Sequence, residues 1–292
     1  MPLRPTPVRP TPVRIVQSKH NPRLKELRRA MSHPGRPSGT PGLALAGIEG
    51  PNLIEEALRA GLRIHCAFAA QGFEHLLQAL PLPPETQILL MPRELLSSAL
   101  ATEAPQPIAA LAEPPDWTWA HLLHSHRKAA PLLVVLAGLQ DPGNLGAILR
   151  SAEAFGADGV LALPGTVSAW NPKAVRASAG SVFRLPLLTV SEEHCLAYLR
   201  EAGVKLLSTS VSDAPPADLV DLTEPVALLI GNEGNGVPER LAAQTGGKIT
   251  IPCPGPVESL NAAVAAGVLL YEASRQRAER SGGPASHLGS TR

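Results

Sequence analysis

The stretches IGNEGNGVP (230–238) and IPCPGPVESLN (251–261) decide the fold of this chain. Each follows a short apolar run and is bent by Gly or Pro, so the main chain can come close to a bound molecule. Ser259 and Asn261 lead directly into an Ala- and Val-rich helical segment, where they can cap the helix or act on a substrate. A third stretch, DPGNLGAILRSAEAFG (141–156), repeats the order of strand, tight turn and helix. Three such turns predict a ligand site in an α/β domain.

The C-terminal half has the pattern of an open parallel sheet. Runs such as LLVVLA (132–137) are apolar throughout, which indicates strands buried on both faces. Their alternation with helical segments predicts a doubly wound α/β domain. We expect strands at 132–137, 159–163, 205–209, 226–230 and 248–251, and helices at 144–155, 172–179, 192–202, 238–243 and 259–279.

A smaller α/β domain is expected ahead of it. A turn at Asn21-Pro22 should open a basic helix that runs to about Met31, and HPGRPSGTPG (33–42) reads as a loop. A strand, a Gly-Pro turn and a helix ended by Gly61 follow, then strands at 64–69 and 87–91 with helices at 73–80 and 93–101. The expected divisions are a disordered Pro-rich tail (1–13), this domain (14–111), a Pro-rich linker (112–131), the second domain (132–280) and a flexible tail (281–292).

Composition narrows the function classes. The net charge is only +1, but residues 1–40 hold nine Lys and Arg side chains and one acid, Glu26. A basic N-terminal segment of this kind is typical of proteins that bind nucleic acid, and a solvated tail is the alternative interpretation. Cys66, Cys195 and Cys253 lack disulfide or zinc spacing, and no apolar run is long enough to span a membrane. We therefore expect a cytoplasmic protein with no metal and no membrane partner.

His121, His124 and His126 raise the possibility of a metal site in the linker. No acidic or Cys partner stands at ligand spacing, so a solvated linker is the favoured interpretation.

The three C-terminal stretches resemble the motifs of the SpoU (TrmH-like) ribose methyltransferases of the SPOUT superfamily. Asn144, Arg150 and Glu153 match the first motif, N-x5-R-x2-E. Gly231, Glu233 and Gly236 match the second, G-x-E-x-x-G. The third motif, I-P-x-x-G-x-x-x-S-L-N, is matched by Ile251, Pro252, Gly255, Ser259, Leu260 and Asn261, with Cys253 where the family often has Met. The N-terminal region resembles, more loosely, the substrate-binding domain found ahead of such catalytic domains.

The resemblance implies a trefoil knot, a homodimer, an RNA substrate and S-adenosylmethionine as methyl donor. It implies that Arg150 holds the target phosphate and helps deprotonate the ribose hydroxyl. Asn144, Glu233, Ser259 and Asn261 complete the implied catalytic set. The implied cofactor-binding residues are Thr209, Ile230, Gly231, Asn232, Glu233, Gly236, Ile251, Pro252, Ser259, Leu260 and Asn261, several of them acting through the main chain.

Each of these residues also has a purely structural interpretation. Asn144 could be a helix N-cap, and Arg150 and Glu153 could form a surface ion pair. Ser259 and Asn261 could cap the final helix. Leu260, Val264, Val268 and Tyr271 recur at helical spacing, and we expect this stripe to pack the final helix against the domain.

The function implied by the resemblance is S-adenosylmethionine-dependent methylation of a ribose 2′-hydroxyl in RNA. The separate N-terminal domain favours ribosomal RNA. Two alternatives stay open at this point: a tRNA ribose methyltransferase of the same family, and an RNA-binding protein that keeps the cofactor pocket without turnover.

Overall fold

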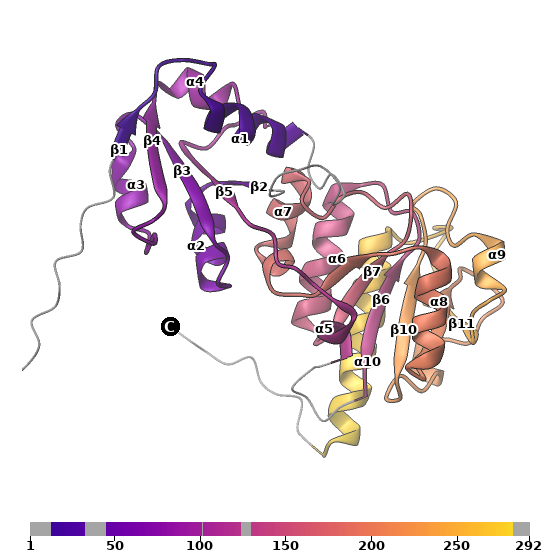
Figure 1. The fold of residues 1–292 in the computed structure, drawn as a ribbon. Helices are drawn as coiled ribbons and strands as arrows, with labels where there is room; N and C mark the ends of the chain where they lie inside the picture. Colours follow the sequence, from indigo (N-terminus) through magenta and orange to yellow (C-terminus); the bar gives the residue numbers. More distant parts are fainter. Residues whose placement is uncertain (1–12, 33–44, 101, 124–129, 283–292) are drawn as a thin grey trace, which may run out of the picture. The chain divides into compact units, whose positions relative to one another are not determined.

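The computed structural model describes residues 13–32, 45–100, 102–123 and 130–282. The chain forms two compact units, each with its own sheet (Figure 1). The first contains residues up to 115 together with 168–183, and the second contains 116–167 and 184 onward. Most of the expected N-terminal tail, the loop at 33–42 and the end of the chain after Gly282 lie outside the described residues. Val13, which we placed in the tail, begins a strand.

The first unit has a five-stranded mixed sheet in the order β1-β4-β3-β5-β2. Its strands are β1 (Val13–Ile15), β2 (Ala46–Glu49), β3 (Ile64–Ala70), β4 (Gln87–Met91) and β5 (Ile108–Ala112). Its helices are α1 (Pro22–Ser32), α2 (Pro51–Arg59), α3 (Glu74–Gln78), α4 (Arg93–Ser97) and α7 (Pro172–Ser178), with a 3₁₀ turn η1 (Ser181–Phe183). β1, β4 and β3 are parallel, whereas β5 runs antiparallel to β2 and β3.

The core of the first unit explains why the expected small α/β domain forms. Leu24, Leu27 and Met31 recur at helical spacing on α1 and pack with Phe68 and Leu96. The sequence did not predict β1 or β5 as strands. β1 has only three residues, and β5 reads IAALA, which is rich in Ala and therefore has little β-propensity of its own.

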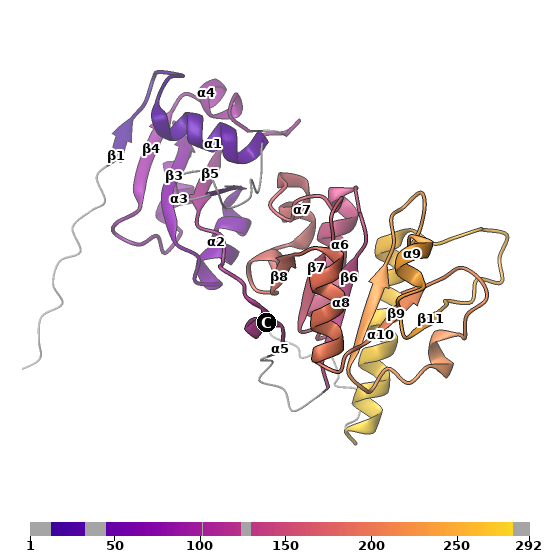
Figure 2. The same cartoon turned by 45° about the vertical axis from the view of Figure 1, so that its right-hand side comes forward.

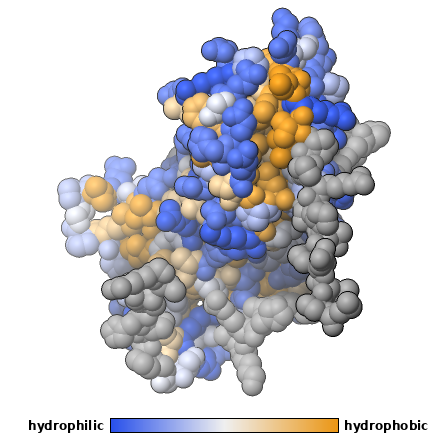
Figure 3. Space-filling model, turned by 90° about the vertical axis from the view of Figure 1, so that its left-hand side faces the viewer, coloured by the Kyte–Doolittle hydropathy of each residue, from blue (hydrophilic) through white to orange (hydrophobic). Residues whose placement is uncertain are grey.

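β1 lies at one edge of this sheet, and its side chains are not covered by described residues. Val13 is 54% exposed and Ile15 is 65% exposed. Figure 3 shows an apolar strip among hydrophilic residues on the face that is turned toward the viewer. A three-residue edge strand offers few unpaired backbone groups, which limits pairing with another chain.

The second unit has a six-stranded, all-parallel sheet in the order β11-β9-β10-β6-β7-β8. Its strands are β6 (Leu132–Leu136), β7 (Gly159–Ala162), β8 (Leu187–Thr189), β9 (Lys205–Thr209), β10 (Val226–Ile230) and β11 (Gly247–Ile249). Its helices are α5 (Trp119–Leu123), α6 (Pro142–Ala154), α8 (Glu192–Glu201), α9 (Glu239–Ala242) and α10 (Ala262–Arg280), with a 3₁₀ turn η2 (Ala217–Leu219).

Helices cover both faces of this sheet, as expected for a doubly wound domain (Figure 2). Leu122 of α5, Leu199 of α8 and Leu241 of α9 share a core with Leu133 and Leu229 of the central strands. α6 and α10 pack against each other on the other face. All five strands that we predicted are present. β8, with the sequence LLT, was missed because it is too short to show a pattern. The trefoil knot stays a prediction.

The residues that we expected as a linker contain the helix α5, which packs on the second unit. The ring of Trp119 lies 4.1 Å from the ring of Tyr198, whose hydroxyl donates to the Trp119 carbonyl at 2.9 Å. Leu122 is fully buried. A Cβ placed on Gly159 would lie 2.3 Å from a methyl carbon of the buried Leu122 and 2.9 Å from the backbone oxygen of Pro186, which cannot move aside, so this position of β7 needs glycine.

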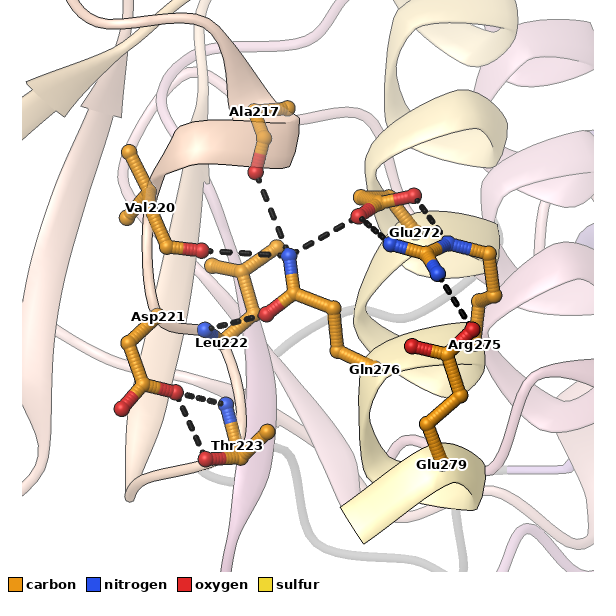
Figure 4. A network of polar contacts seen from close by, with 9 residues as sticks. All are labelled: Ala217, Val220, Asp221, Leu222, Thr223, Glu272, Arg275, Gln276 and Glu279. Atoms are coloured by element: carbon orange, nitrogen blue, oxygen red, sulfur yellow. Dashed lines mark hydrogen bonds and ion pairs between the residues drawn. The ribbon is translucent and has the colours of Figure 1, made fainter.

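The C-terminal half of α10 holds the segment that precedes β10 (Figure 4). The side-chain amide of Gln276 donates to the carbonyls of Ala217 and Val220 and accepts from the Leu222 N–H. Arg277 donates to the carbonyls of Leu222 and Glu224, and also to those of Ala130 and Pro131 ahead of β6. Two side chains therefore satisfy backbone groups on two incoming segments.

In the part of the chain that the structure describes, no helix is long and apolar enough to cross a membrane. The same residues contain no group of three His, Cys, Asp or Glu side chains placed to hold a metal ion. His124 and His126 lie outside the described residues, and His121 accepts a hydrogen bond from the Thr118 N–H at 3.0 Å.

Candidate active site

The three motif loops meet at one edge of the second sheet. Parallel strands all end on the same side, and the loops that follow β6, β10 and β11 leave that side. β10 lies directly between β6 and β9, so the loop after β10 falls between the other two. Ligands of open α/β sheets bind outside the carboxyl ends of the strands, where the connections diverge in opposite directions.

Glu233, between two glycines of the loop after β10, is the centre of the polar contacts at this edge. Its carboxylate accepts hydrogen bonds from the backbone N–H groups of Gln140 at 3.2 Å and Asp141 at 3.0 Å. It also accepts one from the side-chain amide of Asn144 at 3.0 Å. Glu233 therefore ties the loop after β10 to the loop after β6.

Asn144 continues this chain of contacts to the third motif. Its side-chain oxygen accepts from the amide of Asn261 at 3.0 Å. The oxygen of Asn261 in turn accepts from the backbone N–H groups of Ala263 at 2.9 Å and Val264 at 3.3 Å, which makes Asn261 the N-cap of α10. Glu233, Asn144 and Asn261, one from each motif, thus form a single hydrogen-bonded row.

The ionisation of Glu233 fits this role. Partial burial favours the neutral acid, but the hydrogen bonds from Asn144 and from the backbone outweigh it, and the pKa of the Glu233 carboxyl lies below its ordinary value. Hydrogen bonds that stabilise the charged form of a carboxyl have this effect. Glu233 is consequently a carboxylate at neutral pH and acts only as an acceptor.

The loop from Gly231 to Gly236 is fixed by its own backbone. The N–H and the carbonyl of Asn232 bond to Gly236 at 2.9 Å each, and Gly236 has a positive φ of 65°. A Cβ on Gly231 would lie 2.1 Å from the carbonyl carbon of Gly236, so only glycine fits there. The Asn232 amide also donates to the carbonyl of Gly138 at 2.8 Å, which places a second bond between the loops after β10 and β6.

The loop at 251–260 leaves its backbone open. Residues 252–259 are all exposed, and no N–H of residues 251–260 donates to any residue that the structure describes. In this exposed loop water can satisfy the N–H groups, and a ligand can take its place. A loop with free N–H groups beside two tightly fixed loops suits a ligand that is recognised through the main chain.

Arg150 lies apart from the hydrogen-bonded row. It is exposed on α6, six residues after Asn144, and its side chain forms no hydrogen bond or ion pair within the described part of the chain. The alternative of an ion pair with Glu153 is wrong, because Glu153 accepts two hydrogen bonds from Arg184, at 2.6 Å and 3.0 Å. The guanidinium of Arg150 is left available for an anion.

Two expected helix caps are wrong. Asp141, not Asn144, is the N-cap of α6 and accepts from the Asn144 N–H at 2.8 Å. Pro142 follows at the first helical position, where its fixed φ suits helix initiation. The Asp-Pro pair was the signal for Asp141, which we did not select. Likewise Ser259 does not cap α10, which begins at Ala262 rather than at 259.

Among the other expected site residues, Ile230 is buried at the end of β10, and Leu260 and Ile251 are half-buried. The Thr209 hydroxyl donates to the carbonyl of Leu229 at 2.9 Å. Pro252 and Cys253 are exposed, and the Cys253 thiol lies 3.4 Å from the Ile251 carbonyl. Ser259 is exposed, and no bond joins it to the described residues.

Comparison with known proteins identifies this arrangement. Residues 131–271 match the SpoU rRNA Methylase family, and residues 48–118 match the RNA 2′-O ribose methyltransferase substrate-binding domain. The chain is 34% identical over 226 residues to the 23S rRNA (guanosine(2553)-2′-O)-methyltransferase RlmP of Bacillus subtilis. That match covers 77% of this chain and 86% of the relative.

Solved structures agree with these sequence matches. The S-adenosylmethionine-bound rRNA methyltransferase from Sinorhizobium meliloti superposes with a TM-score of 0.75 at 30% identity, covering 90% of this chain and 98% of that one. The SpoU methyltransferase AviRb from Streptomyces viridochromogenes, in complex with the same cofactor, gives a TM-score of 0.74 at 28% identity. It covers 90% of this chain and 100% of that one.

The chain belongs to the SpoU rRNA methylase family and has the family's N-terminal substrate-binding domain. Its activity is S-adenosylmethionine-dependent methylation of a ribose 2′-hydroxyl in RNA. The predicted family, fold class, activity and cofactor are confirmed.

Proposed function

We propose that the RNA substrate of this chain is ribosomal RNA and that the chain acts as a homodimer. The observation that carries the choice of substrate is the match to a 23S rRNA 2′-O-methyltransferase over most of both chains. The first unit supports it. Lys25 and Arg29 of α1 are exposed four residues apart and have no ion-pair partner among the described residues. Exposed cations without acidic partners attract RNA phosphates.

Arg150 is the proposed catalytic residue. A ribose hydroxyl ionises far above neutral pH, so its oxygen becomes nucleophilic only if a base accepts the proton or a cation stabilises the developing negative charge. Arg150 stays charged, is exposed and has no ion-pair partner in the described part of the chain. A planar guanidinium binds a phosphate through two parallel hydrogen bonds. Arg150 would therefore hold the target nucleotide and stabilise its alkoxide.

The row Glu233, Asn144 and Asn261 is proposed to position this reaction. Because Glu233 is a carboxylate, it orients the amide of Asn144, and Asn144 orients Asn261 at the start of α10. Holding reacting groups in line is a large part of the acceleration in a displacement reaction. In this proposal Ser259 and Asn261 contact the ribose and the cofactor, and Glu233 keeps the loops closed around them.

The cofactor would be held by the loops after β9, β10 and β11. The open N–H groups of the loop at 251–260 fit a ligand recognised by the main chain, and Thr209, Ile230, Gly231, Asn232, Gly236, Pro252 and Leu260 would line the same place. When bound, S-adenosylmethionine supplies an electrophilic methyl group on a sulfonium. The chain's own residues position the ribose oxygen and exclude water.

The proposal of a dimer rests on the exposed apolar side chains of α10. We expected Leu260, Val264, Val268 and Tyr271 to pack this helix against the domain, and that expectation is wrong. Val264 is 52%, Val268 is 40% and Tyr271 is 55% exposed. The buried face consists of Ala266, Leu269, Leu270 and Ala273. α10 is therefore apolar on two faces, and the second face suits a copy of this chain, because a C₂ contact can pair the same stripe from each subunit.

Methyl transfer from tritium-labelled S-adenosylmethionine tests the function. Purified protein is incubated with ribosomal RNA or with tRNA from a strain that lacks the gene, and methylated riboses are mapped. Label in ribosomal RNA alone is the expected result. Label in tRNA alone would overturn the choice of substrate. Bound cofactor without label in either RNA would favour a binding protein without turnover.

Sedimentation of the wild type and of a Val264→Asp, Val268→Asp variant tests the dimer, and Tyr271 is kept because its ring packs edge-on against Phe155. Because both side chains are exposed, the changes should leave the fold intact and produce a monomer. A wild-type protein that sediments as a monomer at all concentrations would contradict the proposal.

A further inference from the structure

The first unit contains a buried carboxylate that the reaction does not use. The side chain of Glu49, at the end of β2, is 3% exposed. Its Oε1 accepts from the Thr102 hydroxyl at 2.9 Å and from the Gln106 N–H at 2.8 Å. These two bonds fix the carboxylate. Its Oε2 is buried and accepts no hydrogen bond from a described residue.

The only ion-pair partner of Glu49 in the described residues is Arg176 of α7. Its Nη1 lies 3.6 Å from the buried Oε2. This separation is longer than that of a charge-assisted hydrogen bond, about 2.8 Å, so Glu49 attracts the guanidinium without occupying its donors. The Arg176 side chain is 42% exposed and has no other bond within the described part of the chain. One side of the guanidinium therefore faces a fixed negative charge and the other faces solvent.

The surrounding sequence favours an anion. From residue 159 to residue 191 the chain has no Asp or Glu, and its charged residues there are Lys173, Arg176 and Arg184. Lys173 and Arg176 are three residues apart on α7, and both are exposed. Side chains three apart on a helix lie on one face. α7 itself therefore carries two cations and no acid, and Glu56 of α2 lies beside Gly180, just after α7.

We propose that Arg176, in the first unit, is a contact for an RNA phosphate and that Glu49 is the residue that positions it. Ordering a long arginine side chain costs conformational entropy. A carboxylate fixed behind the guanidinium removes much of that cost before RNA arrives. Arginine held in this way presents the paired donors that match a phosphate. This proposal rests on the RNA substrate of the family, and it does not depend on whether that RNA is ribosomal RNA or tRNA.

The experiment measures binding of a fluorescent single-stranded RNA oligonucleotide to full-length protein over a range of salt concentrations. For Arg176→Gln, the slope of log affinity against log salt should fall by about 0.7, the value for one phosphate contact to a single strand. Affinity should drop about 3- to 10-fold at low salt, while affinity for S-adenosylhomocysteine stays unchanged. Arg59→Gln is the matched control: this exposed arginine of α2 is paired with Glu55 and Glu56, so its loss should leave the slope unchanged.

Glu49→Gln tests the positioning role. It keeps an acceptor for Thr102 and Gln106 but removes the charge, so RNA binding should weaken about 2- to 5-fold with the salt slope retained, because Arg176 still reaches the phosphate at a higher entropic cost. In the Arg176→Gln background, Glu49→Gln should weaken RNA binding no further. Arg176→Lys should restore the slope and only part of the affinity.

If Arg176→Gln lowers the melting temperature and leaves the salt slope unchanged, the pair only ties residues 168–183 to β2, and the proposal is wrong. If Arg176→Gln does not fold, the double variant Glu49→Gln, Arg176→Gln carries the test, since it leaves no buried charge unpaired. A wild-type slope in that variant would overturn the proposal as well.

Discussion

The two ends of α10 use similar side chains for different purposes. At its start, the amide of Asn261 joins a row that ends at the carboxylate of Glu233, beside a loop whose N–H groups have no partner in the described residues. Toward its end, Gln276 bonds to backbone groups of Ala217, Val220 and Leu222 (Figure 4), and Arg277 donates to the Leu222 carbonyl. Amides and guanidinium groups alone therefore do not mark a site. What distinguishes the start of α10 is the neighbouring loop at 251–260, whose N–H groups are open to a ligand.

The largest effect is expected in the candidate active site, at Arg150 of α6. Arg150→Ala should lower turnover by about 10²–10⁴-fold, the usual scale for losing proton-transfer assistance or a well-placed cation. Cofactor affinity and melting temperature should hardly change, because Arg150 has no bond to other described residues. Arg200→Ala, at an exposed arginine of α8, is the control. Wild-type turnover in Arg150→Ala would remove Arg150 from the mechanism.

Toward the C-terminal end of α10, a substitution should lower the stability of the protein rather than its turnover. Arg277→Ala removes the Arg277 donor from the carbonyls of Ala130, Leu222 and Glu224, whereas the Pro131 carbonyl keeps its bond from the Val226 N–H. We expect the free energy of unfolding to fall by about 2–3 kcal/mol, with turnover at low temperature within about twofold of wild type. Denaturant unfolding and a methylation assay give both values. Arg275→Ala, which removes pairs with Glu272 and Glu279 only, should be the milder change. A large loss of turnover in folded Arg277→Ala would contradict the contrast between the two ends.

The hydrogen-bonded row of Glu233, Asn144 and Asn261 can be weakened by a substitution that keeps the shape of the side chain. Glu233→Gln replaces one carboxylate oxygen by an NH₂ group that must face the N–H of Gln140 or Asp141. We expect S-adenosylhomocysteine affinity and turnover to fall, each by about 10-fold, close to 1.4 kcal/mol. Calorimetry measures the affinity directly. Unchanged affinity would mean that Glu233 does not hold the cofactor loops.

The pH dependence of the wild type follows from the same residue. The pKa of Glu233 is lower in the folded protein than its ordinary value of 4.5. Its contribution to stability is therefore fully present above pH 4.5 and is lost as the pH falls through the lower folded pKa. Between pH 7 and about pH 5, S-adenosylhomocysteine affinity should not change through titration of Glu233. A decline in the wild type between pH 7 and 5 that is absent from Glu233→Gln would contradict this.

The smallest effect concerns the thiols. Burial raises the pKa of Cys66 and of Cys195 to about 12, whereas Cys253 is exposed in the loop at 251–260. In the native protein at pH 8, iodoacetamide should modify Cys253 alone, because a thiol reacts as the accessible thiolate. S-adenosylhomocysteine should slow the reaction if it covers this loop. Mass spectrometry of digested protein identifies the modified residue, and equal rates with and without ligand would place Cys253 outside the cofactor site.

Long, apolar or periodic segments were readable from the sequence. The central strands β6 and β10 are apolar along their whole length and were predicted, as was α1 from its period of buried Leu residues. Short or Ala-rich strands could not be predicted from the sequence. β1, β8 and β5 gain their stability from pairing with neighbours in the sheet, and three-residue or Ala-rich segments carry too little local preference to show it.

The motif residues were also readable, but their partners were not. Asn144, Glu233 and Asn261 were selected from their resemblance to the family motifs, and the structure brings them into one row. Which of them caps a helix depended on where each helix starts. α6 begins at Pro142, two residues before the expected start at 144, so its N-cap is Asp141 and not Asn144. Partners 89 and 117 residues apart in the chain cannot be read from a local pattern.

The sequence by itself determined the family, the parallel sheet and the loops that form the site, because these depend on residue type, apolar runs and fixed spacing. Only the tertiary structure decided which face of α10 is buried. Both faces are apolar and follow the helical period. The buried face is the one that contains Ala266, Leu269, Leu270 and Ala273. It likewise paired Glu49 with Arg176, 127 residues apart, since such a contact arises only when the second segment packs on the first unit.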